Sequence, residues 1–189
     1  MIQGSKMALK NVTAGNKIPE EMNVIIQIPS NYDPINYVVD KKSGSLFVGS
    51  FQSTSMHYPC NIGYIPNTLS DTAEEPVSVL VVTPLSVHQG CVVRTRPLGM
   101  LALVEKGRII RKIVAVPTSK ITNSYQNVHK TEDLPHHLLQ KIIHFFTHYK
   151  DLDQIEAVKF EGWLSIEAAK REILTGLLRH EKQSNVIPA

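Results

Sequence analysis

The side chains best suited to chemistry stand at two places in the sequence. Asp71 and Glu75 lie in a polar segment that leads into the apolar run 77–82, and carboxylate oxygens are the ligands that hard cations prefer. Further along, His144 and His148 are four residues apart, so they would share one face of a helix. The first place predicts a loop that enters a buried strand, and the second predicts a helix surface whose charge responds to pH.

The composition fits one domain that works in the cytoplasm. At 189 residues, of which 42% are hydrophobic, the chain can bury a full core, so we expect a single domain over 1–189 with an ordered core of about 11–182. The net charge of +3 is spread without a long Lys/Arg block, which argues against a nucleic-acid partner. No stretch approaches membrane-spanning length, and residues 1–10 lack an apolar signal core, so we expect no membrane partner.

The two cysteines predict neither a disulfide framework nor a metal site. Cys60 and Cys91 form no CxxC pair, and each stands beside apolar or aromatic residues. We therefore expect both to be buried free thiols.

The first part of the chain is predicted to form short strands, which would position the candidate residues. Five runs rich in β-branched residues, each closed by Pro or Gly, predict strands at 24–29, 46–48, 77–82, 91–95 and 113–116. Turn residues at 42–44 and 106–107 predict hairpins. Strands this short at near-regular spacing are typical of a closed or nearly closed barrel.

Two helices are predicted to follow the barrel. The first begins near 133–135, with Pro135 in its first turn, and its apolar face contains Leu138, Leu139, Ile142, Ile143, Phe145 and Phe146. Ser165 is the expected N-cap of the second helix, whose buried stripe would consist of Ala169, Ile173, Leu174 and Leu177. These helices would cover the barrel.

Several segments in the correct order resemble the bacterial family I soluble inorganic pyrophosphatases over about 11–182. The most specific is STSMHYPCNIGYI at 53–65, and the others are 18–24, 96–99, 114–117, 144–152 and 161–163. The resemblance implies an α+β fold, a five-stranded OB-like β-barrel flanked by two main helices. It also implies a pocket in which an acidic cluster holds several Mg²⁺ ions, which neutralise diphosphate and activate a bridging water.

The pocket positions implied by this resemblance depart from the family pattern. The candidate catalytic groups still present are Tyr58, Glu75, Glu105, Lys112, Tyr149 and Lys150. The other expected pocket positions are His57 and a set where acidic, basic or phenolic side chains are the rule in the family: Gln27, Asn36, Val38, Ser50, Ile62, Ala73, Ser78 and Ile110. His57 departs from the family's usual aromatic or apolar residue and adds a group that titrates near neutral pH. On this pattern the chain is a degenerate homologue with no metal site.

The candidate groups also have ordinary structural interpretations. Tyr149 and Lys150 close a helix, where the lysine complements the helix dipole, and Tyr58 can serve as an amphipathic wall residue. Lys112 alternates with apolar Ile113 on a strand and can point to solvent. Glu75, Glu105 and His57 can be ordinary surface or packed side chains.

Three functions are compatible with this pattern, and whether the protein is an enzyme stays open at this point. The favoured hypothesis is a protein that has lost Mg²⁺-dependent diphosphate hydrolysis and whose pocket binds, or does acid–base chemistry on, an organic small molecule without a cofactor. The second is a non-catalytic partner in the oligomer of an active paralogue. The third is a weak inorganic pyrophosphatase that uses Glu75 and Glu105 on fewer Mg²⁺ ions.

The resemblance also implies a homo-oligomer. Bacterial members assemble as a dimer of trimers, and His144, His148 and Asp151 match residues at an intersubunit contact of that family. We therefore expect a hexamer whose assembly responds to pH. The alternative is that the two histidines form an exposed, solvated edge.

Overall fold

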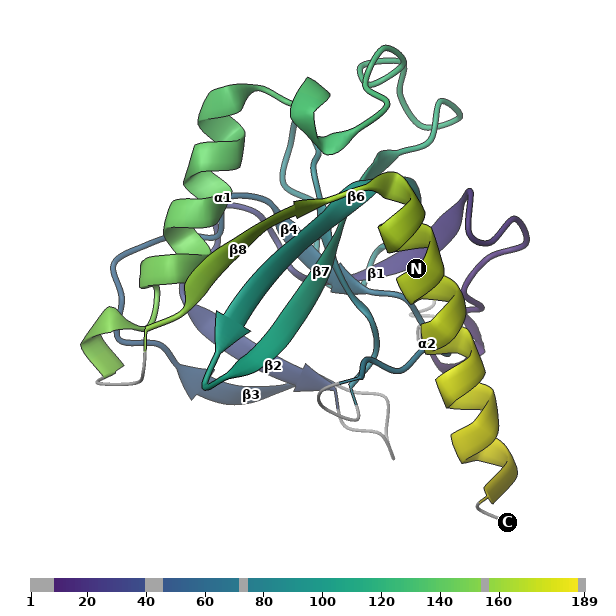
Figure 1. Ribbon diagram of the computed structural model, residues 1–189, viewed down its shortest axis with the longest axis horizontal. Coiled ribbons are helices and arrows are strands. Elements are labelled where there is room, and N and C mark those ends of the chain that lie inside the picture. Colours follow the sequence, from purple (N-terminus) through teal and green to yellow (C-terminus); the bar gives the residue numbers. More distant parts are fainter. Residues whose placement is uncertain (1–8, 40–45, 72–74, 154–156, 187–189) are drawn as a thin grey trace, which may run out of the picture.

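A small closed barrel with helices on its outside forms the fold (Figure 1). The computed structural model describes residues 9–39, 46–71, 75–153 and 157–186. Its strands are β1 (Met22–Ile28), β2 (Ile35–Val39), β3 (Leu46–Phe51), β4 (Asn61–Tyr64), β5 (Ser78–Val81), β6 (Val92–Glu105), β7 (Arg108–Pro117) and β8 (Lys159–Leu164). The helices are α1 (His136–His148) and α2 (Ile166–Val186), with short 3₁₀ turns at Leu9–Asn11, Thr131–Asp133 and Asp151–Asp153.

Five strands close the barrel, as the sequence predicts. The order is β1-β4-β5-β7-β6, and β6 pairs back with β1 through Met22–Thr95 and Ile25–Val92. Among the strand pairs of the described residues, only β5 and β7 run parallel. The long β6 then continues beyond β1 and pairs with β8, so β8 extends the sheet without belonging to the ring. The α+β class and the OB-like barrel with two main helices are therefore confirmed.

The strand assignment from the sequence was partly wrong. The run 46–48 lies in β3, which pairs with β2 in a separate hairpin rather than in the barrel. The strand that completes the ring is β4, which a pattern search for β-branched residues misses because Asn61–Tyr64 contains a glycine and few such residues. The glycine is needed, because a Cβ at Gly63 would approach the Ile25 carbonyl oxygen of β1 to 2.5 Å.

The predicted hairpin at 106–107 is confirmed. Lys106 and Gly107 both have positive φ, 50° and 73°, which is typical of the two-residue turn that joins twisted antiparallel strands. This turn connects β6 to β7. The other predicted hairpin, at 42–44, lies outside the described residues.

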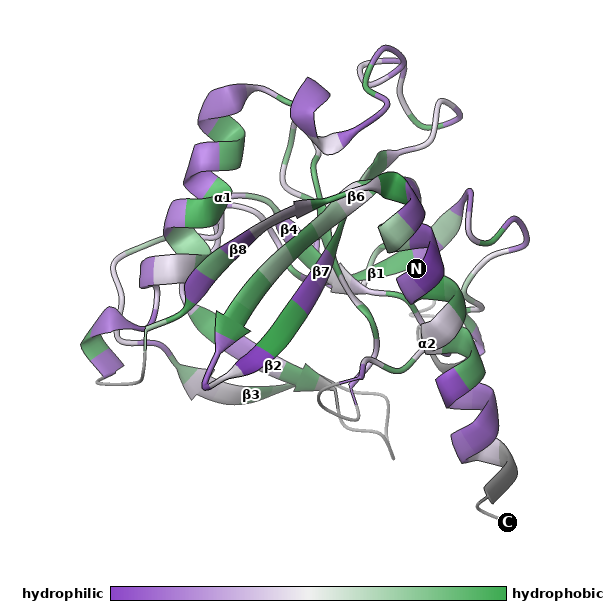
Figure 2. Cartoon of the chain, in the orientation of Figure 1, coloured by the Kyte–Doolittle hydropathy of each residue, from purple (hydrophilic) through white to green (hydrophobic). Residues whose placement is uncertain are grey.

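The helices pack through the apolar faces that the sequence predicts, with one exception (Figure 2). Leu139, Ile142, Phe145 and Phe146 of α1 are buried against the barrel. Ala169 and Ile173 of α2 are buried in a second cluster. Leu174 is 42% exposed, so its expected burial was wrong, because Gly176 takes the close-packing position one turn along from Ile173. Ser165 caps α2, since its Oγ accepts the Ala168 N–H at 3.3 Å.

The two cysteines differ. Cys60 is buried and Cys91 is exposed, so the expectation of two buried thiols was wrong for Cys91, which precedes the exposed start of β6. No helix in the described part of the chain is both long and apolar enough to cross a membrane. That residues 1–189 form a single domain stays a prediction.

Candidate active site

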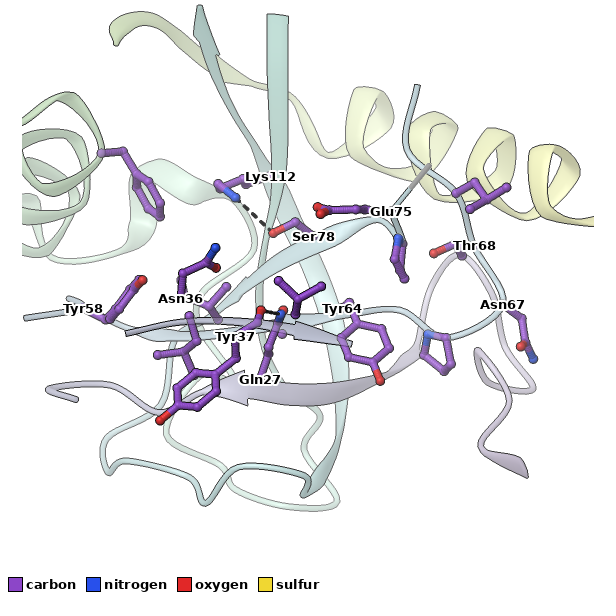
Figure 3. Close-up of a pocket in the computed structure, with 18 of the residues that line it drawn as sticks. Gln27, Asn36, Tyr37, Tyr58, Tyr64, Asn67, Thr68, Glu75, Ser78 and Lys112 are labelled. Atoms are coloured by element: carbon purple, nitrogen blue, oxygen red, sulfur yellow. Dashed lines mark hydrogen bonds between the residues drawn. The ribbon is translucent and has the colours of Figure 1, made fainter. Parts of the chain in front are cut away.

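The main cavity has a volume of about 630 Å³ and opens between the barrel and the β2–β3 hairpin (Figure 3). Strands β1, β4, β5 and β7 supply its floor, β2 supplies one wall, and the ends of α1 and α2 close the sides. Nine of the sequence-predicted residues line it, and Glu105 and Lys150 stand beside it.

Lys112 lies at the centre of the floor, on β7. Its Nζ donates to Ser78 Oγ at 3.2 Å and lies 5.3 Å from the ring centroid of Phe146. Burial lowers the pKa of Lys112, and the nearby charge of Lys150 lowers it further, whereas Glu75 and Glu105 act in the opposite direction. The arrangement gives a positive floor that an anion would stabilise.

Lys150, Glu105 and Tyr149 form a connected group beside the cavity. The Lys150 ammonium donates to Glu105, and its Nζ lies 5.2 Å from the ring centroid of Tyr149. Burial disfavours the Lys150 cation, but the hydrogen bond to Glu105 and the neighbouring Tyr149 outweigh it and raise its pKa. Glu105 thus fixes Lys150 as a charged group, while Tyr149 lines the cavity itself.

Tyr58 supplies a protonated hydroxyl to the same wall. The ring is only 4% exposed and packs against Phe145, with centroids 4.8 Å apart. Burial, with a smaller effect of Tyr149, raises the pKa of Tyr58 to about 12. Tyr58 therefore keeps its O–H at neutral pH and can donate to a bound anion.

Glu75 lies at the open side of the cavity, in the loop before β5. The loop is held by the Ser70 N–H, which donates to the Glu75 carbonyl oxygen at 2.7 Å, and by the Leu69 N–H, which donates to the Gly176 carbonyl oxygen of α2 at 2.9 Å. The Glu75 residue is exposed, and Figure 3 shows its carboxylate directed towards Ser78 and Lys112. A solute entering the cavity therefore meets this carboxylate on its way to the lysine.

The opposite wall is built by β1, β2 and β4. Gln27 Nε2 donates to the Tyr37 carbonyl oxygen, which ties β1 to the hairpin, and Asn36 and Val38 face the cavity from β2. Ile62 on β4 is 7% exposed and adds an apolar side.

Three predicted pocket residues do not line the cavity. Ser50 is exposed on β3, and His57 is exposed with Nδ1 3.3 Å from the Tyr32 carbonyl oxygen. Ile110 on β7 packs against the core cluster beneath α1. Ser50 is removed from the cavity because β3 forms the outer strand of the hairpin, which a linear comparison of motifs cannot show. Ala73 lies outside the described residues.

Sequence reasoning missed other lining residues. The structure adds Tyr37, Tyr64, Asn67, Thr68, Phe146, His180 and Gln183. A sequence signal that could have found some of them is the Pro66–Asn67 pair, which is typical of a turn. In the structure Asn67 has a φ of 57°, and the Thr68 hydroxyl donates to the Ile65 carbonyl oxygen at 2.6 Å. His180 and Gln183 come from the far end of α2, whose path over the cavity depends on tertiary packing.

The residues that the structure describes do not form a cluster for several metal ions. Within the described ranges, no three His, Cys, Asp or Glu side chains gather where they could hold a metal together. Two nearby carboxylates are already paired with cations, Glu105 with Lys150 and Asp71 with Arg111. The cavity floor presents an ammonium group, which repels a divalent cation, and apolar groups, which supply no oxygen ligand for one.

Comparison with known proteins identifies the family. The sequence profile of the Pyrophosphatase family, described as inorganic pyrophosphatase, matches residues 24–181. The chain belongs to the inorganic pyrophosphatase family. Its bacterial, family I type is confirmed by relatives named inorganic pyrophosphatase. The protein from Yersinia pestis is 49% identical over 93% of this chain and 100% of its own length, and that from Escherichia coli K12 is 49% identical over 92% and 98%.

A solved inorganic pyrophosphatase shares the fold. The structure from Coxiella burnetii superposes with a TM-score of 0.84 at 40% identity, over 89% of this chain and 99% of its own. The superposition covers most of the chain, so the fold is that of a solved inorganic pyrophosphatase.

These findings overturn the function favoured from the sequence. We expected a protein that had lost diphosphate hydrolysis, either with a pocket recruited for an organic substrate or as a non-catalytic partner. That expectation was wrong, because relatives sharing 49% of residues over nearly the entire chain are named inorganic pyrophosphatases. The sequence argument weighed each replaced position by itself, whereas folding brings the retained Lys112, Tyr58 and Tyr149 together around one cavity.

Proposed function

We propose that this protein hydrolyses inorganic diphosphate in the cavity floored by Lys112. The observation that carries the proposal is the 49% identity to inorganic pyrophosphatases over 93% of the chain. The geometry supports it, because a buried ammonium facing a hydroxyl-lined cavity favours a small, highly charged anion. The cytoplasmic location expected from the sequence is part of the same proposal.

The side chains divide into binding and positioning roles. Lys112 and Lys150 would attract the phosphoryl oxygens, and the Tyr58 and Tyr149 hydroxyls would donate to them. Glu105 would position Lys150 through their ion pair. Phosphoryl transfer passes through a loose transition state whose charge is spread over the equatorial oxygens, so positioning and electrostatic stabilisation are the main tasks of the protein.

The reaction itself is an addition of water. A water oxygen forms a bond to one phosphorus, the bond from that phosphorus to the bridging oxygen breaks, and the bridging oxygen leaves with the second phosphate. The proton lost by the water passes to the phosphate products or to solvent. We propose that Mg²⁺ is required, since it neutralises part of the charge on diphosphate in solution.

A phosphate-release assay tests the function. Purified protein with diphosphate and excess MgCl₂ is expected to release phosphate with a kcat in the ordinary enzymatic range of roughly 1–10³ s⁻¹. Omission of MgCl₂ with a chelator present should abolish the release. Release no faster than in a matched sample without protein would contradict the proposal.

We also propose that the protein assembles as a hexamer through the end of α1. His148 Nδ1 lies 2.8 Å from Asp151 Oδ2, and the two side chains are 51% and 52% exposed. The His144 and His148 ring centroids are 4.8 Å apart. This exposed His–His–Asp surface matches the position of the intersubunit contact implied by the sequence resemblance.

Light scattering at neutral and mildly acidic pH tests the assembly. Histidine is the side chain whose charge ordinarily changes between neutral and mildly acidic pH, and these two ring centroids lie 4.8 Å apart, so a hexamer at neutral pH is expected to dissociate into smaller species on acidification. His148→Gln should weaken this response to pH. A monomer at neutral pH and micromolar concentration would contradict the hexamer, and a hexamer indifferent to acid would contradict only the role of the histidines.

A further inference from the structure

Gln52 is a polar residue of the cavity to which the proposed reaction assigns no task. It follows β3 directly, where its backbone N–H donates to the Pro34 carbonyl oxygen at 2.9 Å and its carbonyl oxygen accepts the Thr54 N–H at 2.9 Å. These two bonds fix the chain at this residue. The Gln52 side chain lines the cavity together with Tyr58, so it holds a defined position on the wall.

The side-chain amide of Gln52 is bonded to the Tyr58 hydroxyl through its nitrogen. Gln52 Oε1 is enclosed by the protein and has no hydrogen-bond partner among the described residues. Burial raises the pKa of Tyr58, and a side-chain hydrogen bond from Gln52 acts in the opposite direction. A hydrogen bond lowers the pKa of a phenol when its donor points at the phenolic oxygen, because it stabilises the anion. The donor is therefore Gln52 Nε2, and the Tyr58 oxygen accepts.

This bond decides where the Tyr58 proton points. The ring is fixed by its packing against Phe145, with centroids 4.8 Å apart, and a phenolic hydroxyl both donates one proton and accepts. The O–H prefers the plane of the ring, so a donor on one side of the oxygen leaves the other side for the proton. In Figure 3 the Tyr58 hydroxyl lies on the side of the cavity that faces Lys112. An anion bound at Lys112 would accept this proton.

The unpartnered oxygen argues against a purely structural role for the amide. An enclosed carbonyl oxygen without a donor destabilises the folded protein, whereas a methionine of similar length would cover the same wall without that cost. Stability alone therefore favours an apolar side chain at this position. What the amide of Gln52 provides instead is the contact with the Tyr58 hydroxyl.

We propose that Gln52 is a positioning residue of the active site: its Nε2 holds the Tyr58 oxygen so that the phenolic O–H is directed at the diphosphate. Gln52 does not touch the diphosphate and acts through Tyr58 alone. This inference rests on the proposed function and names what sets the direction of one hydrogen bond to the substrate. The effects of the two side chains on binding are therefore coupled.

A double-mutant cycle on ligand binding tests the inference without relying on turnover. Isothermal titration calorimetry measures the affinity for methylenediphosphonate in excess MgCl₂, and the P–C–P bridge of this probe resists hydrolysis. Tyr58→Phe is expected to weaken binding at least about 10-fold, the scale of a hydrogen bond to a charged group, and Gln52→Met about 3- to 10-fold, the scale of a bond between neutral groups. In the Tyr58→Phe background, Gln52→Met is expected to have less than about a 2-fold further effect.

A matched control makes the same change elsewhere. Gln126 is an exposed glutamine outside this cavity, so Gln126→Met should bind methylenediphosphonate as the parent protein does. Circular dichroism checks that each variant is folded.

A spectroscopic readout reports on the hydroxyl itself, which a role in packing alone would not change. The intensity ratio of the tyrosine Raman doublet distinguishes a hydroxyl that accepts a hydrogen bond from one that does not, and subtracting the spectrum of the matching Tyr58→Phe protein isolates Tyr58. The ligand-free parent protein is expected to show an accepting hydroxyl, and Gln52→Met is expected to lose that signature. The first of these spectra decides the matter even where Gln52→Met fails to fold.

The outcomes separate this inference from the proposed function. An affinity for methylenediphosphonate that Gln52→Met leaves unchanged would overturn it, as would an equal loss in the Tyr58→Phe background, no binding by the parent protein, or a Tyr58 hydroxyl that accepts no hydrogen bond in the ligand-free parent. Any of these together with phosphate release from diphosphate would refute the inference and leave the function standing. The expected coupling without phosphate release would refute the function alone.

Discussion

Replacing Lys112 with alanine is expected to lower kcat/KM for diphosphate roughly 10- to 150-fold, which corresponds to the loss of a charge-assisted hydrogen bond of about 1.5–3 kcal/mol. Lys112 supplies the ammonium at the centre of the cavity floor, where it donates to Ser78 and is flanked by Phe146. Steady-state phosphate release measures the effect. Lys159→Ala, which removes an exposed lysine from β8, is the control and should leave kcat/KM unchanged.

The pH dependence of kcat/KM separates the charge of Lys112 from its packing. Binding an anion requires the protonated ammonium, and burial lowers the pKa of Lys112 below the ordinary 10.5. The activity of the parent protein is therefore expected to fall on the alkaline side at a lower pH than an ordinary lysine would give, because kcat/KM reports the free enzyme. Lys112→Arg, which stays charged, should move that decline to higher pH. A decline that Lys112→Arg leaves in place, or a Lys112→Ala variant with the kcat/KM of the parent, would contradict the assignment.

The Phe145→Ala variant is expected to lose about 3–5 kcal/mol of unfolding free energy, the usual cost of removing a fully buried phenylalanine. Phe145 is 1% exposed at the centre of the cluster between α1 and the barrel. Its ring centroid lies 4.8 Å from Tyr58 and 5.2 Å from each of Phe146 and Tyr149. The cavity left behind would border these three residues, which all line the candidate active site, so affinity for diphosphate should fall as well.

Urea unfolding followed by circular dichroism, at one fixed protein concentration, measures this loss. Leu178→Ala provides the control, because that leucine is 55% exposed on α2 and its removal should change the unfolding free energy by less than about 0.5 kcal/mol. A loss below about 1.5 kcal/mol for Phe145→Ala would show that the helix does not depend on this ring for its attachment to the barrel.

Much of the fold could be predicted from the sequence, because local patterns determine much of it. The apolar spacing of α1, the cap at Ser165 and the turn at 106–107 depend on residues close together in the chain, and the structure confirms each of them. Which strands form the barrel was harder to predict from the sequence. β4 closes the ring through long-range pairing with β1 and β5, and its residues have little intrinsic preference for a strand.

The candidate site shows the same division. The sequence alone supplied the family and the candidate groups Tyr58, Glu75, Lys112 and Lys150, because motif order and spacing are properties of the chain. Only the tertiary structure shows that Ser50 and His57 lie away from the cavity. It also shows that Glu105 forms an ion pair with Lys150. The reason is physical: whether a carboxylate is available to a metal, or a lysine to an anion, depends on the charges that folding brings next to it, and those charges come from residues distant in the sequence.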